Sequence, residues 1–339
     1  VRNKKAGNLR VKSITLKDSD GTTALKRNYT YNHPTDTTFS SGVFREFPKS
    51  YITEYPPDDS GYFCRYINYV NNYDVNTSTF KGKSVVYEYV EEEYINTDNT
   101  SENYYTKKQF SLPIIQGSLY PNALPKTPFV DNSFTGGLLL NSQAFNSNDE
   151  KVSETTNLYE FDNHFNNKSY NNYSFGGVGS NAVSGGIVIS LKSAWPADLR
   201  YNWNVFFYTS TWVKLLESTT KTYFDNATSS IESKTTYQYD DSDQAYYRHI
   251  KPISQTTHDS LGEEVKTVYE YPQELLNEPH TSDLVDANRI ANPLITSNYK
   301  NIIGVYQLIG KQKSIYEDWG NGILEPEKIQ TLKGELSAT

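Results

Sequence analysis

Alternating hydrophobic and polar positions, interrupted by short polar turns, recur along this chain. The clearest example runs from Leu9 to Tyr31, where Asp18-Ser19-Asp20-Gly21 separates two alternating runs. Alternation with a period of two is typical of a half-buried strand, and Asp, Ser and Gly supply the turn chemistry of a hairpin. Two further segments have the same form, Leu215–Tyr239 with Asp225-Asn226 at its turn and Ile253–Tyr271 with Asp259-Ser260-Leu261-Gly262 at its turn. The pattern predicts three β-hairpins.

Each of these hairpins ends in Tyr-x-Tyr, and the turn aspartate precedes the first tyrosine by 11, 12 and 10 residues respectively. This spacing indicates a degenerate repeat. Val86-Tyr87-Glu88-Tyr89 is a fourth copy of the ending without an obvious preceding turn. Residues two apart share one face of a strand, so each motif should place two rings side by side, and stacked hairpins should align them. Cross-strand aromatic packing is the favoured interpretation, and a platform that stacks sugars or other ligands is the alternative.

The rest of the chain is less regular. Between Gly117 and Ser210, Asn, Gly, Ser and aromatic residues replace the alternation, with a Pro-rich passage at 120–128 and a Gly-rich passage at 174–180, which predicts β-structure with long loops. One short helix is expected at about Ser282–Ile290, with Ser282 as its N-cap and a stop before Pro293. We therefore predict an all-β fold of antiparallel hairpins in extended sheets, with little helix. Its three regions are an N-terminal hairpin region (1–116), the Asn/Gly/aromatic-rich region (117–210) and C-terminal hairpin repeats (211–339).

Composition supports strands and argues against several functions. The chain has 29 Tyr, 15 Phe and 4 Trp in 339 residues, and its mean hydropathy of -0.69 indicates much exposed sheet, so we expect wide, thin sheets. The formal charge is 32 minus 40, or -8, without a basic block, which argues against nucleic acid as a partner. Cys64 is the single cysteine, so neither an intrachain disulfide nor a cysteine-based zinc cluster can form. The sequence has no apolar run of the roughly 20 residues that span a bilayer.

No local motif indicates a reaction centre, a cofactor or a metal. The Gly-rich passage lacks both the Gly-Lys-Ser/Thr ending of a phosphate loop and the last glycine of the dinucleotide fingerprint. Asp240-Asp241-Ser242-Asp243 could offer oxygens to calcium, but a turn is the favoured interpretation. His33, His164, His249, His258 and His280 show no metal-ligand spacing. We predict no catalytic activity, although a pair of carboxylates defined only in space would escape this reasoning.

A glycan-binding surface is the remaining candidate site. Such a surface presents exposed Trp or Tyr rings, and Trp195, Trp203 and Trp212 lie close together in the sequence. Core packing between sheets is the alternative role for the same three residues.

Several runs resemble the region that precedes the repeats in RHS/YD-repeat proteins of Bacteroidetes. They are LRVKSITLKDSDGTTALKRNYTY, KSVVYEYVEEEY, LLESTTKTYFD, TTHDSLGEEVKTVYEYP, LVDANRIANPLITSNY and IYEDWGNGILEPEKIQTLKGE, the last being the most specific, and they cover about two thirds of the chain. The stretch from Gly117 to Ser210 has no counterpart. Tyr73-Asp74 and Tyr239-Asp240 are Tyr-Asp pairs that lack the Gly-Arg-Leu-like ending of the family, so this is a divergent segment.

The resemblance implies a part of a very large exported protein, similar in kind to WapA-like surface proteins. In that family β-hairpins wind into a hollow shell that encloses a C-terminal toxin or effector. The expected partners are the remainder of the same shell and, through the type 9 secretion system, an outer-membrane translocon and shuttle proteins. The expected location is the cell surface or the medium.

The two ends of the sequence add one expectation. Lys328–Glu335 reads as a strand that enters a turn, and Leu9 begins a strand almost at once. We expect a return strand downstream and further residues upstream, so that the segment depends on neighbouring chain and associates or unfolds readily when isolated.

Overall fold

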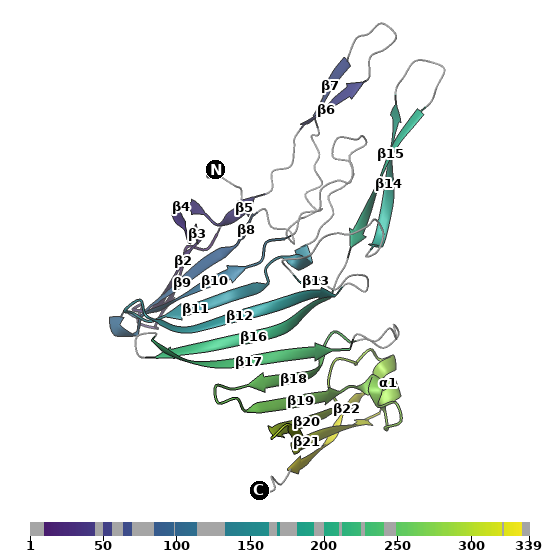
Figure 1. Ribbon diagram of the computed structural model, residues 1–339. Helices are drawn as coiled ribbons and strands as arrows, with labels where there is room; N and C mark the ends of the chain where they lie inside the picture. Colours follow the sequence, from purple (N-terminus) through teal and green to yellow (C-terminus); the bar gives the residue numbers. More distant parts are fainter. Residues whose placement is uncertain are drawn as a thin grey trace. The chain divides into compact units, whose positions relative to one another are not determined.

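The computed structural model describes residues 10–44, 50–55, 64–69, 85–97, 99–113, 133–162, 168–169, 182–192, 200–209, 212–224, 228–240, 249–320 and 322–333. These residues form mostly antiparallel β-sheet with one short α-helix, so the predicted fold class is confirmed (Figure 1). The chain divides into two compact units. Unit 1 comprises Val1–Asp149 and Phe161–Val213, and unit 2 comprises Glu150–Glu160 and Lys214–Thr339.

In unit 1, strands β1, β2, β9, β10 and β11 form an antiparallel ladder in that order, and β3–β4, β5–β8, β6–β7 and β14–β15 are two-stranded pairs. The elements are β1 (Ser13–Lys17), β2 (Thr23–Thr30), β3 (Asn32–His33), β4 (Asp36–Ser40), β5 (Gly42–Phe44), β6 (Ser50–Tyr55), β7 (Cys64–Tyr69), β8 (Val85–Tyr87), β9 (Tyr89–Ile95), η1 (Thr100–Glu102), β10 (Tyr104–Phe110), η2 (Ser133–Thr135), β11 (Leu139–Phe145), β13 (Lys168–Ser169), β14 (Ala182–Lys192) and β15 (Arg200–Thr209).

In unit 2, the ladder order is β12, β16, β17, β18, β19, β20, β21 and β22, and successive strands from β16 onward are antiparallel neighbours. The elements are β12 (Lys151–Asp162), β16 (Trp212–Phe224), β17 (Ser229–Tyr239), β18 (Pro252–His258), β19 (Glu264–Glu270), η4 (Pro272–Glu274), α1 (Thr281–Asp286), β20 (Ile295–Ile302), β21 (Val305–Asp318) and β22 (Leu324–Lys333).

Two of the predicted hairpin turns have the same structure. In the β1–β2 turn the amide of Gly21 donates to the carbonyl of Asp18 (2.9 Å), and in the β18–β19 turn Gly262 donates in the same way to Asp259 (3.1 Å). Both glycines have positive φ, 86° and 78°, which a residue without Cβ adopts at little cost. The turn at Asp225-Asn226 lies outside the described residues.

The predicted helix exists, but its N-cap was assigned wrongly. It begins at Thr281 after His280, whose backbone is left-handed (φ 60°), so Ser282 lies inside the first turn. Asn288 also takes positive φ (56°), and the next amide, that of Arg289, bonds back to the carbonyl of Leu284 (2.8 Å). This left-handed cap ends the helix earlier than the proline would.

Large hydrophobic side chains are buried at few places in the described residues. They are Phe161, Tyr271, Leu284, Leu294, Ile295, Tyr316 and Leu324. Leu284 of α1 packs with Leu294, Tyr316 and Leu324, so the connection between β19 and β20 covers one end of the β21–β22 hairpin. Most ladder residues elsewhere are half-buried on both faces, as expected for a thin sheet.

The last described strand, β22, pairs back with β21, from Asp318 opposite Leu324 to Gly310 opposite Lys333. Gly334, where the sequence predicts a turn, lies outside the described residues, and the expected downstream return strand stays a prediction.

Candidate functional site

The three predicted hairpins share one polar contact, which we call the tyrosine lock. In each hairpin the second tyrosine of Tyr-x-Tyr donates its hydroxyl hydrogen to a backbone carbonyl near the start of the first strand. The three bonds are Tyr31 to Val11 (2.9 Å), Tyr239 to Leu215 (3.0 Å) and Tyr271 to Pro252 (2.8 Å). A phenol at the open end of each hairpin thus joins its two strands opposite the turn.

A basic residue precedes each acceptor carbonyl, namely Arg10, Lys214 and Lys251. The Arg10 guanidinium carbon lies 5.1 Å from the ring centroid of Tyr31, and Lys214 Nζ lies 5.9 Å from that of Tyr239. Both distances are within the range of cation–π attraction. The sequence pattern alone did not single out these basic residues. Each lies immediately before its acceptor residue, so an alignment of the three hairpins on their Tyr-x-Tyr motifs could have found them.

The third hairpin replaces the cation by an imidazole. The ring of His249 lies 3.8 Å from that of Tyr271 between centroids, and the amide of Lys251 donates to His249 Nδ1 (3.2 Å). His249 and Tyr271 are both almost fully buried, at 3% exposure. Burial raises the pKa of the Tyr31, Tyr239 and Tyr271 hydroxyls, so the neutral donor form is the one that the folded chain favours.

The tyrosines of the two successive hairpins in unit 2 share one face of the ladder. The β17–β18 and β18–β19 registers place Tyr237, Tyr239 and Tyr269 on that face. Burial raises the pKa of Tyr269, and the nearby Tyr237 raises it further. Within these two hairpins, Tyr237, Tyr239 and Tyr269 therefore share one face, as the sequence predicts.

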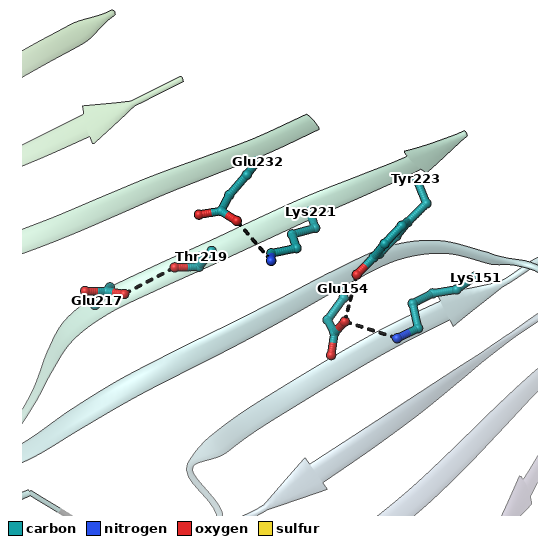
Figure 2. Close-up of polar contacts among 7 residues, drawn as sticks. All are labelled: Lys151, Glu154, Glu217, Thr219, Lys221, Tyr223 and Glu232. Carbon is teal, nitrogen blue, oxygen red and sulfur yellow. Dashed lines mark hydrogen bonds and ion pairs between the residues drawn. The ribbon is translucent and has the colours of Figure 1, made fainter. Parts of the chain in front are cut away.

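The opposite face of the same ladder is charged. Figure 2 shows Lys221 paired with Glu232 (3.0 Å), and Glu154 accepting from the Tyr223 hydroxyl (3.0 Å) and from Lys151 (3.1 Å). Glu217 accepts from Thr219 (3.3 Å) in the same view, and it also pairs with Lys234 (2.7 Å). Exposed pairs of this kind contribute little stability each, so their main effect is a well-hydrated face that favours one strand register.

Unit 1 holds a second polar cluster, around Glu92, which is 8% exposed. Glu92 accepts from the Tyr29 hydroxyl (2.9 Å) and from Lys108 Nζ (3.1 Å), which ties β9 to both neighbouring strands. Burial alone would raise the pKa of Glu92, but these two bonds prevail and lower it. Tyr94 stacks on Tyr104 at 4.2 Å, and burial with the nearby Glu92 raises the pKa of Tyr94 to about 12.

Two of the three tryptophans lie in described strands. Trp203 lies in β15, opposite Ile189 of β14, and Trp212 begins β16 and is half-buried. Trp195 lies outside the described residues, so glycan stacking by these three stays a prediction.

Other candidate sites fall partly outside the described chain. Asp240 follows β17, whereas Asp241 and Asp243 and the passages at 120–128 and 174–180 are not described. Within the described ranges there is no group of three or more His, Cys, Asp or Glu that could hold a metal ion. None of the helices in those ranges is long and apolar enough to cross a membrane.

Comparison with known proteins gives little. The sequence matches no family model and no curated protein. A chain in the crystal structure of TcdB2-TccC3-Cdc42 is similar with a TM-score of 0.39 and 11% identity over 89% of this chain and 14% of that one. A chain in the crystal structure of TcdB2-TccC3-TEV is similar with a TM-score of 0.38 and 11% identity over 88% of this chain and 14% of that one. Both TM-scores are too low to carry an argument, and this chain spans about a seventh of either neighbour.

Proposed function

We propose that this chain is a non-catalytic wall segment of a large exported RHS/YD-repeat protein that encloses a C-terminal toxin or effector. The family, its Bacteroidetes setting and its cargo come from the resemblance of the hairpin runs. The proposal needs no cofactor, no metal and no nucleic acid.

The repeated tyrosine lock is the observation that carries this proposal. An active site brings its functional side chains together at one place. Here the same hydrogen bond recurs at Tyr31, Tyr239 and Tyr271, one in each hairpin. A hairpin closed by such a bond is a structural unit that can be repeated along a sheet. The thin ladder of unit 2, with tyrosines on one face and ion pairs on the other, suits a wall with two distinct sides.

The remaining parts of the proposal follow from the same resemblance. The wall segment joins the remainder of its own shell, which covers the sheet edges. The protein is secreted or held at the cell surface, and an outer-membrane translocon and shuttle proteins of the type 9 secretion system are its partners during export.

Limited proteolysis of the longer protein tests whether this segment acts as a wall around the cargo. We expect the C-terminal cargo to resist protease in the intact shell. The double variant Tyr239→Phe with Tyr271→Phe loosens two neighbouring hairpins and should speed digestion of the cargo. Tyr269→Phe, which changes a ring on the same face without a lock, should leave the rate unchanged. Equal protection of the cargo in all three proteins would refute a wall role for this segment.

The chain alone provides a second test. An isolated wall segment should associate or melt at a lower temperature than the longer protein, as judged by light scattering and circular dichroism. A monodisperse monomer with an equally high melting temperature would mark an autonomous domain and contradict the proposal.

A further inference from the structure

Two tyrosine rings on the neighbouring strands β9 and β10 of unit 1 are stacked face to face. The register places Tyr94 directly opposite Tyr104, and their ring centroids lie 4.2 Å apart with an interplanar angle of 11°. This separation is shorter than the range of about 4.5–7 Å that aromatic pairs prefer. Tyr104 is 44% exposed, so a small solute can reach the pair. Two phenols in this arrangement are close enough to react with each other.

The connection between the two strands holds the rings in place. The Asn96 amide donates to Asn103 Oδ1 (2.8 Å), and the Glu102 carboxylate accepts from the side chains of Asn96 and Asn99 (2.8 Å each). These bonds tie the connection together at several points, so the register of the two tyrosines does not depend on their hydroxyls. Two groups held in contact react as if at very high concentration, because folding has already brought them together.

The Tyr94 hydroxyl has an acceptor for its proton. It hydrogen-bonds to the Glu92 carboxylate, which also accepts from Tyr29 (2.9 Å) and Lys108 (3.1 Å). Burial opposes these bonds, but they prevail and lower the pKa of Glu92, so this carboxylate is ionised at neutral pH. The Arg27 guanidinium, 5.0 Å from the Tyr94 ring centroid, disfavours a positive charge on the ring, and proton transfer to Glu92 removes that charge.

A second close tyrosine pair in unit 1 has a different environment. Tyr31 and Tyr87 lie 4.4 Å apart between centroids, but their rings are inclined by 46°, and Arg10 lies 5.1 Å and 5.9 Å from the two centroids. A cation beside both rings opposes the loss of an electron from either one. Within the described residues no cation lies over the ring of Tyr104, so this exposed ring can lose the first electron.

We propose that Tyr94 and Tyr104 form a dityrosine cross-link when a one-electron oxidant acts on the chain. Each ring gives one electron to the oxidant and one proton, from Tyr94 to Glu92 and from Tyr104 to water. The two phenoxyl radicals then combine to form a carbon–carbon bond between ring carbons next to the hydroxyls. The hydrogens on these carbons leave as protons while the phenol oxygens are reprotonated, so both phenols are restored. The chain loses two hydrogen atoms, two equivalents of oxidant are reduced, and β9 is joined covalently to β10. This inference does not depend on the wall proposal.

Photo-oxidation of the full chain tests this proposal. Tris(bipyridyl)ruthenium(III), generated by light and persulfate, is the one-electron oxidant, and the monomer is isolated by gel filtration. Cleavage after Glu102 separates Tyr94 from Tyr104, so mass spectrometry should find the two peptides joined and lighter by two hydrogens than their sum. The same oxidation in urea should lower the yield of this cross-link about tenfold, because unfolding separates the rings.

Two phenylalanine variants identify the tyrosine that is bonded. Tyr104→Phe keeps a ring opposite Tyr94 but lacks the second phenol, so it should abolish the cross-link. The matched control is Tyr105→Phe, at the next position on the opposite face. Tyr105 stacks on Phe145 at 4.8 Å with an interplanar angle of 8°, and phenylalanine has no hydroxyl from which to form a phenoxyl radical. Tyr105→Phe should therefore leave the cross-link unchanged.

Four outcomes would overturn the proposal. They are an absence of the cross-link between Tyr94 and Tyr104 in the folded wild type, an equal yield in urea, an equal loss in Tyr104→Phe and Tyr105→Phe, and a bond that forms only between separate chains.

Discussion

The contribution of the third tyrosine lock to folding stability can be measured by removing the hydroxyl oxygen of Tyr271. Tyr271→Phe keeps the ring against His249 and removes the hydroxyl that donates to Pro252 (2.8 Å). Tyr271 is 3% exposed, so water cannot easily replace the lost donor. A neutral hydrogen bond contributes about 1 kcal/mol net, and a buried acceptor left without a donor costs about 1–3 kcal/mol. We expect a loss of about 1–2 kcal/mol.

The matched control for this variant lies two residues away, on the same face. The Tyr269 hydroxyl makes no hydrogen bond to any described residue, and Tyr269→Phe should cost less than about 0.5 kcal/mol, the usual range for a change that breaks no specific contact. Urea unfolding followed by tryptophan fluorescence compares the two variants. Amide hydrogen exchange in the segment 252–271 reports opening of this hairpin by itself. Equal losses in both variants would show that general burial, and not the lock, determines the stability.

Three further predictions concern other contacts. Hydrogen bonds from the Tyr306 hydroxyl and the Asn301 side-chain amide lower the pKa of Glu264, so its contribution to folding stability is present above an unfolded-state pKa near 4.5 and is lost as the pH falls through the folded-state pKa. Glu264→Gln should flatten this loss of stability at acid pH, as measured by urea titrations at several pH values. Leu284→Ala, at a site 2% exposed in the one buried cluster described, should destabilise by about 2–5 kcal/mol in denaturant unfolding, and a loss below 1 kcal/mol would mean that α1 is not anchored there. Gly136→Ala would place a Cβ 2.4 Å from Cγ of Pro113 and 2.9 Å from its backbone nitrogen, so we expect a loss of about 1–3 kcal/mol in thermal melts, with an unchanged melting temperature as the contradicting result.

The hairpins could be predicted because their determinants are local. Asp18 and Gly21, like Asp259 and Gly262, are residue types whose backbone and side-chain preferences already define the turn. Alternation then assigns the faces, which is why the shared face of Tyr237 and Tyr269 could be predicted as well. The helix start was missed because His280 takes a left-handed backbone that no local preference requires.

The hydrogen-bond partners of the tyrosine locks and of Glu92 could not be predicted from local sequence. The locks accept at backbone carbonyls, which have no residue identity in the sequence, so only a known register reveals them. Glu92 joins a tyrosine 63 residues away, a contact that depends on which strands become neighbours. Ile303 has a left-handed backbone conformation in a two-residue turn that lacks the Asn-Gly sequence typical of such turns.

The short sequence span of the tyrosine locks has a consequence for the order of folding. The three locks close loops of 20, 24 and 19 residues, whereas the Tyr29–Glu92 bond between β2 and β9 closes one of 63. Loop-closure entropy grows with the logarithm of length, so a lock costs about 1 kcal/mol less to close than the longer contact. Each hairpin can therefore form by itself within its own stretch of chain, and the pairing of β2 with β9 has to wait for the residues between them. Assembly of the sheet becomes a sequence of fast local steps joined by slower nonlocal ones.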